Sequence, residues 1–538
     1  MQKILSGIFI SVLMGTSAMG QALPPAPSAV LMPPVSPPAA AAPPPVREST
    51  RPSIAKPATG RIRAIAVTGA RAIHKAAIAK EFSVLLGKRA SIAGLRAALD
   101  RVNKRYADAG YALCRAAIPA QTMRGGVLTV RVREGYIDKV TVRGDAPRLR
   151  ETIARYAARL TAMRPLRTAA LDRFLRLGAD IPGVKVSAGL TKMDPRTGAV
   201  HLALTATYHP FSTALALAPG TVQSLPVLPY VTLGANNLLG DADRFALTAL
   251  ASPRPKDEYF FQFAGSAALG KNGWRIATTD FTAKARANGL PPGIDLSATQ
   301  WHGELQLSDP LIETGLERMT LTGGGYFARM GYDLNHRGIA RDRYFAGYLQ
   351  WSDRRQVSAR FSRMLSLRAT GGFALADALS RSRANATTDF ARLGADAALY
   401  YAPDAAFGIL LRADGQLASG SLMAGEEVVY GGARFGRGYD SGVLSGDAGL
   451  GLSLQPQYGF ALAPDWRVTT YAFGDYAHVA NTRGDRQGNA TLASAGIGFD
   501  VTHGAYSAGL GIAQPLKSFS GYRYKLTPRL FGTLQAQL

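Results

Sequence analysis

The sequence has 538 residues, a formal net charge of +25 and an apolar fraction of 47%. That length predicts two to four domains rather than one. The 58 glycines and the low charged fraction of 18% favour β-rich structure with many turns. No apolar run reaches the roughly 18 residues that a membrane-spanning helix requires. The single cysteine, Cys114, excludes an internal disulfide framework and is expected to be a small packed side chain.

The positive charge is concentrated in one part of the chain. Residues 61–210 hold 28 Lys and Arg against 10 Asp and Glu, whereas residues 211–538 hold 30 against 26. The basic part lacks zinc-ligand spacing, interleaved aromatic residues and a recognition helix, so no nucleic-acid partner is expected. Solvated basic faces, or attraction to an acidic partner or a membrane surface, explain the charge better.

Residues 1–22 have the pattern of a secretory signal peptide. A lysine precedes an apolar run over 4–14, and small residues then permit cleavage after Gly20 or Ala22. The Pro/Ala-rich segment 23–60 favours an extended polyproline conformation and is interpreted as a linker. The protein is therefore predicted to leave the cytoplasm.

Two units of similar order follow, at 61–135 and 136–210. In each of them the apolar spacing predicts the order β-α-α-β-β. In the second unit, Pro182-Gly183 separates a helix from a strand. The same order found twice within about 150 residues indicates a repeat.

After Pro210 the helical spacing disappears. The chain becomes a series of alternating segments of about ten residues, such as 245–250 and 344–351, separated by Gly, Pro, Asp and Asn. This pattern is typical of transmembrane β-strands, whose lipid face alternates with a polar lumen face. The segments start near residues 211, 226, 243, 257, 273, 297, 317, 341, 355, 386, 406, 446, 465, 489, 504 and 527, which predicts a sixteen-stranded antiparallel barrel over 211–538. A soluble β-sandwich or a propeller fits an array without blade repeats less well.

The stretch from Tyr430 to Gly449 holds seven glycines in twenty residues. Such density permits tight backbone paths with positive φ, which indicates a loop. In its middle, Arg437 lies between Gly436 and Gly438 and is followed by Tyr439. A guanidinium stays charged and offers five donors in a planar fork, so in an enclosed space it requires a carboxylate.

Asp475 is the candidate partner of Arg437. It follows Phe473 by two positions inside an otherwise strand-like run over 466–479. The alternative is a long surface loop that contains an incidental arginine, and the spacing alone does not decide between the two.

The arrangement of signal peptide, Pro-rich segment, two β-α-α-β-β units and barrel resembles the outer-membrane transporters of two-partner secretion, the TpsB family. Exporters of filamentous haemagglutinin and haemolysin belong to this family, and the repeated units resemble its two POTRA domains. The resemblance implies a bacterial outer-membrane location, with the POTRA domains in the periplasm. It also implies export of a large TpsA-like exoprotein of the haemolysin or adhesin class, captured by the POTRA domains and conducted by the barrel. Outer-membrane lipid and, during insertion, the barrel-assembly machinery are the other partners that it implies.

Two motifs carry the resemblance. The family's Val-Arg-Gly-Tyr/Phe motif, in a long loop after strand eleven, corresponds to residues 436–439, with glycine in place of valine. The family's Phe-x-Asp-x-Gly motif on the barrel wall corresponds to Phe473, Asp475 and Ala477, with alanine in place of the last glycine. The resemblance therefore implies that Arg437 pairs with Asp475 and fixes the loop inside the pore.

The chain also departs from the family pattern at both ends. It ends in Leu538 where the family usually ends in phenylalanine, so the assembly signal over 530–538 is slightly off pattern. The segment 23–60 has no good helical run, so the plug helix that precedes the family's POTRA domains is not expected here.

No enzymatic or cofactor-binding pattern is recognised. The seven histidines are scattered, and the sequence has no His-Glu-x-x-His pair, no glycine-flanked nucleophilic serine and no Gly-Lys-Ser/Thr phosphate loop. Catalytic residues, a metal site and a cofactor are therefore not predicted. Two other functions stay open, namely a general barrel-assembly factor and a diffusion porin with periplasmic domains.

Overall fold

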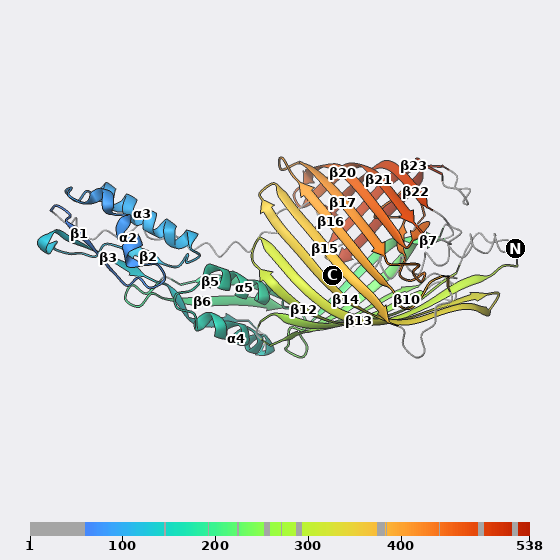
Figure 1. Ribbon diagram of the computed structural model, residues 1–538, viewed down its shortest axis with the longest axis horizontal. Coiled ribbons are helices and arrows are strands. Elements are labelled where there is room, and N and C mark those ends of the chain that lie inside the picture. The colour runs from blue at the N-terminus through green and yellow to red at the C-terminus, as the bar shows by residue number, and fades with distance from the viewer. Residues whose placement is uncertain are drawn as a thin grey trace.

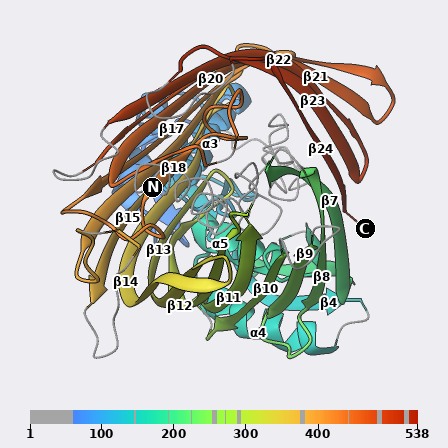
Figure 2. The same ribbon diagram turned by 90° about the vertical axis from the view of Figure 1, so that its right-hand side faces the viewer.

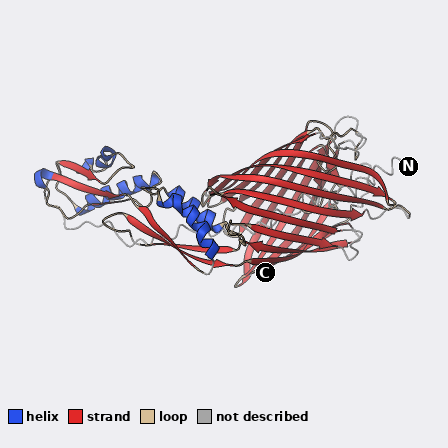
Figure 3. Ribbon diagram, turned by 90° about the horizontal axis from the view of Figure 1, so that it is seen from below, coloured by secondary structure: helices blue, strands red, loops and turns tan. Residues whose placement is uncertain are grey.

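In the computed structural model, two small α/β units stand at one end of a long β-barrel (Figure 1). The described residues are 60–144, 147–191, 193–222, 225–251, 259–270, 272–286, 293–373, 382–383, 385–440, 442–481, 489–518 and 526–537. The predicted signal peptide, nearly all of the Pro/Ala-rich linker and Leu538 lie outside these ranges. Among the described residues, the helices belong to the two small units and the barrel is built of strands (Figure 3).

The first unit is a three-stranded sheet with two α-helices. Its elements are β1 (Ala64–Thr68), α2 (Lys75–Lys80), η1 (Ser83–Leu85), α3 (Ile92–Asp108), β2 (Arg115–Ala117), η2 (Arg124–Gly126) and β3 (Val127–Arg133). β1 runs parallel to β3, and β2 runs antiparallel to it. Ser91 caps α3 by accepting a hydrogen bond from the backbone N–H of Gly94. Leu95, Leu99 and Val102 form the buried face of α3 at helical spacing.

The second unit repeats this topology. Its elements are β4 (Tyr136–Arg143), α4 (Pro147–Thr161), α5 (Thr168–Ala179), β5 (Val184–Leu190) and β6 (Ala199–Tyr208). β4 runs parallel to β6, and β5 runs antiparallel to it at the edge of the sheet. The β-α-α-β-β order predicted from the sequence is therefore confirmed in both units.

Sixteen antiparallel strands close into a barrel, seen end-on in Figure 2. They are β7 (Phe211–Val222), β8 (Leu225–Asn236), β9 (Arg244–Ala251), β10 (Tyr259–Leu269), β11 (Trp274–Arg286), β12 (Leu296–Glu313), β13 (Glu317–Leu334), β14 (Arg337–Ser358), β15 (Phe361–Phe373), β16 (Ala391–Tyr401), β17 (Phe407–Ala418), β20 (Ala448–Ala463), β21 (Trp466–Ala480), β22 (Ala490–His503), β23 (Tyr506–Pro515) and β24 (Arg529–Gln537). β24 pairs with β7 to complete the ring.

The predicted strand number is confirmed, but two predicted strand starts are early. The starts expected near 355 and 386 fall before β15 and β16, which begin at Phe361 and Ala391. The reason is that β14 continues for 22 residues, to Ser358. The C-terminal end of β14 is polar and rich in arginine. Its alternation of side chains is the same as at the start of a new strand, so the pattern does not mark where β14 ends.

The period-2 alternation separates a lumen face from a lipid face. On β14, Tyr344, Ala346 and Tyr348 are buried in a cluster that includes Leu422 and Met423, which lie between β17 and β20. At the alternate positions, Phe345 and Leu349 are 36% and 55% exposed. Large apolar side chains exposed in such a band are typical of a surface that faces lipid. Among the described helices, none is both long and apolar enough to cross a membrane.

The second unit packs directly on one rim of the barrel. Ala242, at the turn that joins β8 to β9, and Ala268, near the end of β10, are part of the unit's own hydrophobic core. Arg155 on α4 pairs with Asp241 on the first of these turns, at 2.9 Å. This rim of the barrel therefore contributes residues to the second unit's hydrophobic core. The unit and the barrel are in direct contact rather than joined by a linker.

Cys114 provides a test of the packing of the first unit. It is fully buried, and this burial raises the pKa of its thiol to about 11. Since only the thiolate reacts, alkylation at pH 8 should be roughly a hundredfold slower in the native protein than in guanidinium. The raised pKa stabilises the fold below the unfolded thiol's pKa, and this contribution should be lost as the pH rises from about 9 toward 11. Timed iodoacetamide labelling followed by mass spectrometry measures the rates, and equal rates in the two states would contradict the buried placement.

Candidate functional site in the barrel lumen

The chain between β17 and β20 folds into the barrel, where it packs on inward-facing wall residues. We define residues 419–447 as the lumenal loop. It contains a short hairpin of β18 (Val428–Tyr430) and β19 (Leu444–Gly446). The loop predicted from the sequence, 430–449, begins too late and ends too late, because β20 already starts at Ala448. The sequence prediction of this loop relied on the density of glycines. Residues 419–429 contain only two glycines, so the first part of the loop was missed.

Arg437 and Asp475 lie together on the barrel wall. The Nε of Arg437 lies 3.1 Å from Asp475 Oδ2, and its Nη2 lies 2.8 Å from Asp475 Oδ1. This is a bidentate pair between a planar guanidinium fork and a carboxylate. Their side chains are 9% and 0% exposed. An ion pair so deeply buried is stable only when both charges are fully hydrogen-bonded.

The remaining acceptor positions of Asp475 are also occupied. The backbone N–H groups of Arg437 and Gly436 donate to Oδ2 at 3.0 and 3.3 Å. The Ser453 hydroxyl donates to Oδ1 at 2.8 Å, and the Ser494 hydroxyl donates to Oδ2 at 3.4 Å. The carboxylate therefore binds the loop's backbone as well as its guanidinium, which fixes the loop's position and not only its charge.

Aromatic side chains hold both sides of the pair. The Arg437 guanidinium carbon lies 3.4 Å from the centre of the Phe473 ring, a cation–π contact. Tyr439 is fully buried. Its hydroxyl lies 2.8 Å from the carbonyl of Ala493 and 2.6 Å from that of Lys517, and it accepts a hydrogen bond from the Lys517 N–H at 3.1 Å. Through Tyr439, the loop is thereby attached to the residues that follow β23, in addition to its attachment to β21 through Asp475.

The glycines beside Arg437 are required by close approach. Gly436 has φ +93°, and a Cβ there would lie 2.7 Å from a methyl carbon of Leu492. A β-branched residue does not fit that conformation, which accounts for glycine at the position where the family pattern has valine. A Cβ on Gly438 would lie 2.8 Å from the backbone nitrogen of Pro515 and 2.9 Å from the Cβ of Ser494.

The second departure from the family pattern also has a packing role. Ala477 is fully buried and belongs to the hydrophobic cluster that includes Tyr430, Tyr439 and Leu444 of the lumenal loop. Its methyl group adds apolar contact between β21 and the loop. Alanine in place of glycine is therefore compatible with a seated loop.

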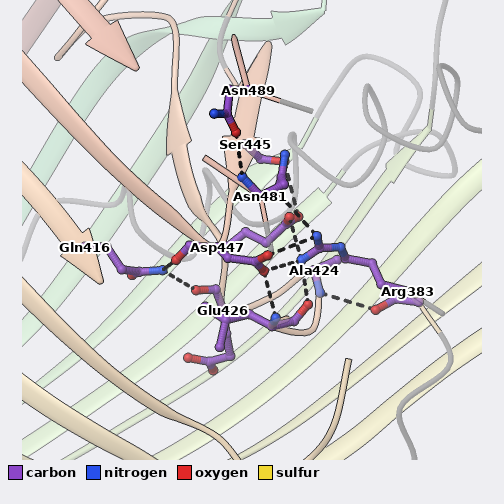
Figure 4. Close-up of polar contacts among 11 residues, drawn as sticks. Arg383, Gln416, Ala424, Glu426, Ser445, Asp447, Asn481 and Asn489 are labelled. Carbon is purple, nitrogen blue, oxygen red and sulfur yellow. Dashed lines mark hydrogen bonds and ion pairs between the residues drawn. The ribbon is translucent and has the colours of Figure 1, made fainter. Parts of the chain in front are cut away.

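A second buried ionic cluster holds the root of the lumenal loop (Figure 4). Arg383, which lies between β15 and β16, places its Nη1 2.5 Å from Asp447 Oδ1 and 2.9 Å from Glu427 Oε1. The same nitrogen donates to the carbonyl of Leu422 at 2.8 Å. Gln416 on β17 donates to the carbonyls of Glu426 and Asp447 at 2.9 and 3.1 Å. These contacts join the first and last residues of the loop to each other and to the wall.

Glu426 is the centre of the wall contacts at the root. Its Oε1 accepts hydrogen bonds from the hydroxyls of Tyr326 and Tyr344, at 2.8 and 2.7 Å. Its Oε2 lies 2.7 Å from Nε of Arg392 on β16. Glu426 thus connects the loop to β13, β14 and β16, and its side chain is only 4% exposed.

Two further contacts lie between the root and the tip. The hydroxyl of Tyr430 donates to Asp414 Oδ1 at 2.9 Å, and Arg434 pairs with Asp396 at 2.7 Å. The second of these pairs is about half exposed, so it contributes little.

Sequence reasoning pointed to the tip of the loop and missed its root. The structure brings all six proposed residues into one site: Gly436, Arg437, Gly438, Tyr439, Phe473 and Asp475. It adds Arg383, Arg392 and Glu426, which no motif marks. A run of two acids, Glu426 and Glu427, inside a glycine-poor part of a barrel loop was the only available signal. Among the described residues, no group of three or more His, Cys, Asp and Glu is placed to hold a metal ion.

Two family models match the chain. Residues 61–135 match the POTRA domain of ShlB type, and residues 334–501 match the haemolysin secretion/activation protein ShlB/FhaC/HecB. The second match includes the whole lumenal loop and the whole of β21. No curated protein matches the chain significantly.

Solved structures share the fold over nearly the full length. CdiB from Escherichia coli has a TM-score of 0.73 at 19% identity, and CdiB from Acinetobacter baumannii has 0.65 at 16%; each match covers 91% of this chain and 92% of the other. BamA from Haemophilus ducreyi, lacking POTRA domains 1–3, has 0.51 at 14%, over 89% of this chain and all of that one. At these identities the matches show a shared fold.

The fold and the family models define a class. The molecule is a sixteen-stranded barrel that carries a POTRA domain, a combination that implies an outer-membrane location with the α/β units in the periplasm. The ShlB-type POTRA model and the ShlB/FhaC/HecB model each match part of the chain, and together they confirm the resemblance to the TpsB transporters of two-partner secretion seen in the sequence. This family consists of transporters rather than enzymes.

The glycines flanking the site supply a matched pair of variants. Gly438→Ala places a methyl group against the backbone of Pro515, so the tip of the loop must shift away from the wall. Gly474→Ala, next to Asp475, meets no atom within 4 Å. We expect the first variant to raise the ion conductance of the barrel in planar bilayers several-fold and the second to leave it unchanged. Equal conductance in the two variants would show that the tip of the loop does not seal the lumen.

Proposed function

We propose that the protein exports a large exoprotein of the haemolysin or adhesin class from the periplasm to the cell surface. The two α/β units capture the client, and the barrel conducts it in an extended form. The observation that carries this proposal is the loop fixed across the lumen by the buried pair of Arg437 and Asp475. We infer that a diffusion porin would not need this loop.

The α/β units supply both charge and sheet edges for capture. Residues 61–210 carry a net charge of +18, counted from 28 basic and 10 acidic residues. No described strand pairs with the outer edge of β5, where Lys185 is exposed. An extended client can add a strand to such an edge through main-chain hydrogen bonds, with little demand on its sequence.

The free energy that drives export must come from the exoprotein itself. No nucleotide is available outside the inner membrane, and the sequence has no phosphate-binding Gly-Lys-Ser/Thr loop. Folding of the exoprotein at the cell surface then makes export irreversible.

Deletion of the gene separates this function from the two alternatives. For an exporter, one large protein disappears from the culture medium or cell surface while other outer-membrane proteins stay at their normal levels. Loss of many outer-membrane barrels would indicate an assembly factor, and a change in small-solute uptake alone would indicate a porin.

The pair of Arg437 and Asp475 gives a sharp mutational prediction. Removing one partner from a buried ion pair typically costs about 3–5 kcal/mol, because the other charge is left buried. Arg437→Ala and Asp475→Ala should each reduce secretion strongly while the barrel stays inserted. The double variant should be no worse than either single one, since both remove the same contact. The measurement is the amount of secreted client for the parent protein, the two single variants and the double variant, at equal amounts of barrel in the outer membrane. Additive defects, or full export by Arg437→Ala, would refute the role of the pair.

Client capture is predicted to depend on salt. Attraction between exposed charges is screened over about 8 Å at physiological ionic strength and over less at higher salt. Binding of the client's N-terminal region to the full-length protein in detergent should therefore weaken as sodium chloride is raised. Titration calorimetry gives the dependence. Binding that is unaffected by salt would remove the electrostatic part of the proposal, and absence of binding would remove the capture step.

A further inference from the structure

Arg412 on β17 is a lumen-facing arginine without a partner. On this strand the buried side chains of Leu410 and Gln416 face the lumen, whereas Leu417 is 67% exposed on the outer surface. Arg412 has the parity of the lumen-facing set and is partly buried. Within the described ranges, its guanidinium forms no hydrogen bond, ion pair or ring contact. A partly buried charge is costly without a partner, so its position calls for a role that the seated loop does not show.

The strand register places Arg412 in the same row as Asp475. Arg412 is the direct cross-strand partner of Ser453 on β20, and Ser453 is the direct partner of Asp475 on β21. Neighbouring strands lie about 4.8 Å apart, so the backbones of β17 and β21 are about 10 Å apart in this row. The long side chain of arginine and the short one of aspartate can together bridge that distance across the small serine. Arg412 is therefore within reach of the carboxylate that holds Arg437.

The charges around Arg412 oppose one another. Arg437 and Arg434 of the lumenal loop repel it, and Asp475 of the wall attracts it. The carboxylate is already occupied, because Arg437 donates to both of its oxygens and the Ser453 hydroxyl donates to Oδ1. With the tip of the loop seated, Arg412 thus meets two like charges and a carboxylate that already has its partners.

Two further carboxylates lie near the tip, and loop groups engage both of them. Asp414, two positions along β17, accepts the Tyr430 hydroxyl at 2.9 Å. Asp396 on β16 pairs with Arg434 at 2.7 Å. The carboxylate that remains for Arg412 is the one on β21, and it becomes available when the tip gives it up.

We propose that Arg412 is the replacement partner of Asp475. When the tip of the lumenal loop leaves the wall, the Arg412 guanidinium extends over Ser453 and forms the ion pair that Arg437 has given up. This inference rests on the proposed export function, since it concerns the state in which the tip makes room for a client. The exchange replaces one guanidinium by another, so the departing tip does not leave a buried carboxylate unpaired. It also separates Arg412 from the two arginines of the loop.

As a positioning residue of this kind, Arg412 favours release of the tip. It adds repulsion to the seated state and an ion pair to the released state, and both differences lower the free energy of release. The effect has a definite sign. Removing Arg412 should hold the tip more firmly on the wall, whereas removing a residue that only supports the seated loop would loosen it.

The first test is the gating of the full-length protein in planar bilayers. Arg412→Gln should open roughly two- to fivefold less often than the parent protein, the range expected for one cross-strand charge contact. Arg412→Lys keeps the positive charge and should open more often than Arg412→Gln. Arg467→Gln is the matched control. It removes an arginine that has the parity of Asp475 on β21 but lies eight positions away, and it should leave the frequency of opening unchanged.

The second test is a stability cycle, measured as the temperature at which the barrel loses its heat-dependent gel mobility. In the parent protein Asp475 has Arg437, so Arg412→Gln should not lower this temperature. In the Arg437→Ala background Arg412 is the cation left beside the carboxylate, and Arg412→Gln should lower the temperature by about 2 °C or more. When Asp475→Asn is added to Arg437→Ala, the effect of Arg412→Gln should disappear.

Neither measurement uses a client, so the results are independent of whether the protein exports one, which the gene deletion tests. Unchanged or more frequent opening of Arg412→Gln would overturn the proposal, and so would an equal loss of opening in Arg467→Gln or equal opening of the glutamine and lysine variants. An equal decrease in stability in the parent and Arg437→Ala backgrounds would also overturn it, because that result assigns Arg412 to general support of the barrel.

Discussion

A single buried carboxylate, Asp475, sets the geometry of the lumen. Its two oxygens accept hydrogen bonds from the Arg437 guanidinium, two backbone N–H groups and two wall serines. A charge removed from water in this way must be satisfied completely, and that requirement brings the loop's backbone into contact with β21. Contact at this distance then excludes side chains at Gly436 and Gly438. Glycine at positions 436 and 438 is therefore a consequence of this close approach rather than of flexibility.

The loop is held at two separate places, and this determines how it can move. The tip depends on Asp475 and the root on Glu426, both buried, together with Arg383, whose side chain is 11% exposed. Breaking one buried pair costs about 3–5 kcal/mol, so simultaneous release of both ends at rest is very rare.

Much of the architecture follows from periodicity in the sequence. The repeat of β-α-α-β-β units and the sixteen alternating segments are local patterns of period 3.6 and 2, which the backbone geometry imposes directly. Arg437 and Asp475 were found through their motifs, because glycines and an aromatic residue accompany each charge. Arg383 and Glu426 could not be found in this way. Their partners are Tyr326, Tyr344, Asp447 and others up to a hundred positions away, and an isolated charge carries no local mark of a distant partner. The sequence also predicted a strand start near residue 355, inside β14. The arginines at this end of β14 resemble the polar residues of a turn.

The most direct test of the seated loop is a distance measurement between the loop and the barrel. Spin labels at Ala433→Cys in the loop and Ala463→Cys at the end of β20, both exposed, can be introduced after Cys114→Ser removes the sequence's only cysteine. Double electron–electron resonance should give one narrow distance distribution in the parent protein. Asp475→Asn should broaden it and shift it, because the neutral amide no longer balances Arg437. A broad distribution in the parent protein, or one that Asp475→Asn leaves unchanged, would contradict the account in which this pair holds the loop in the lumen.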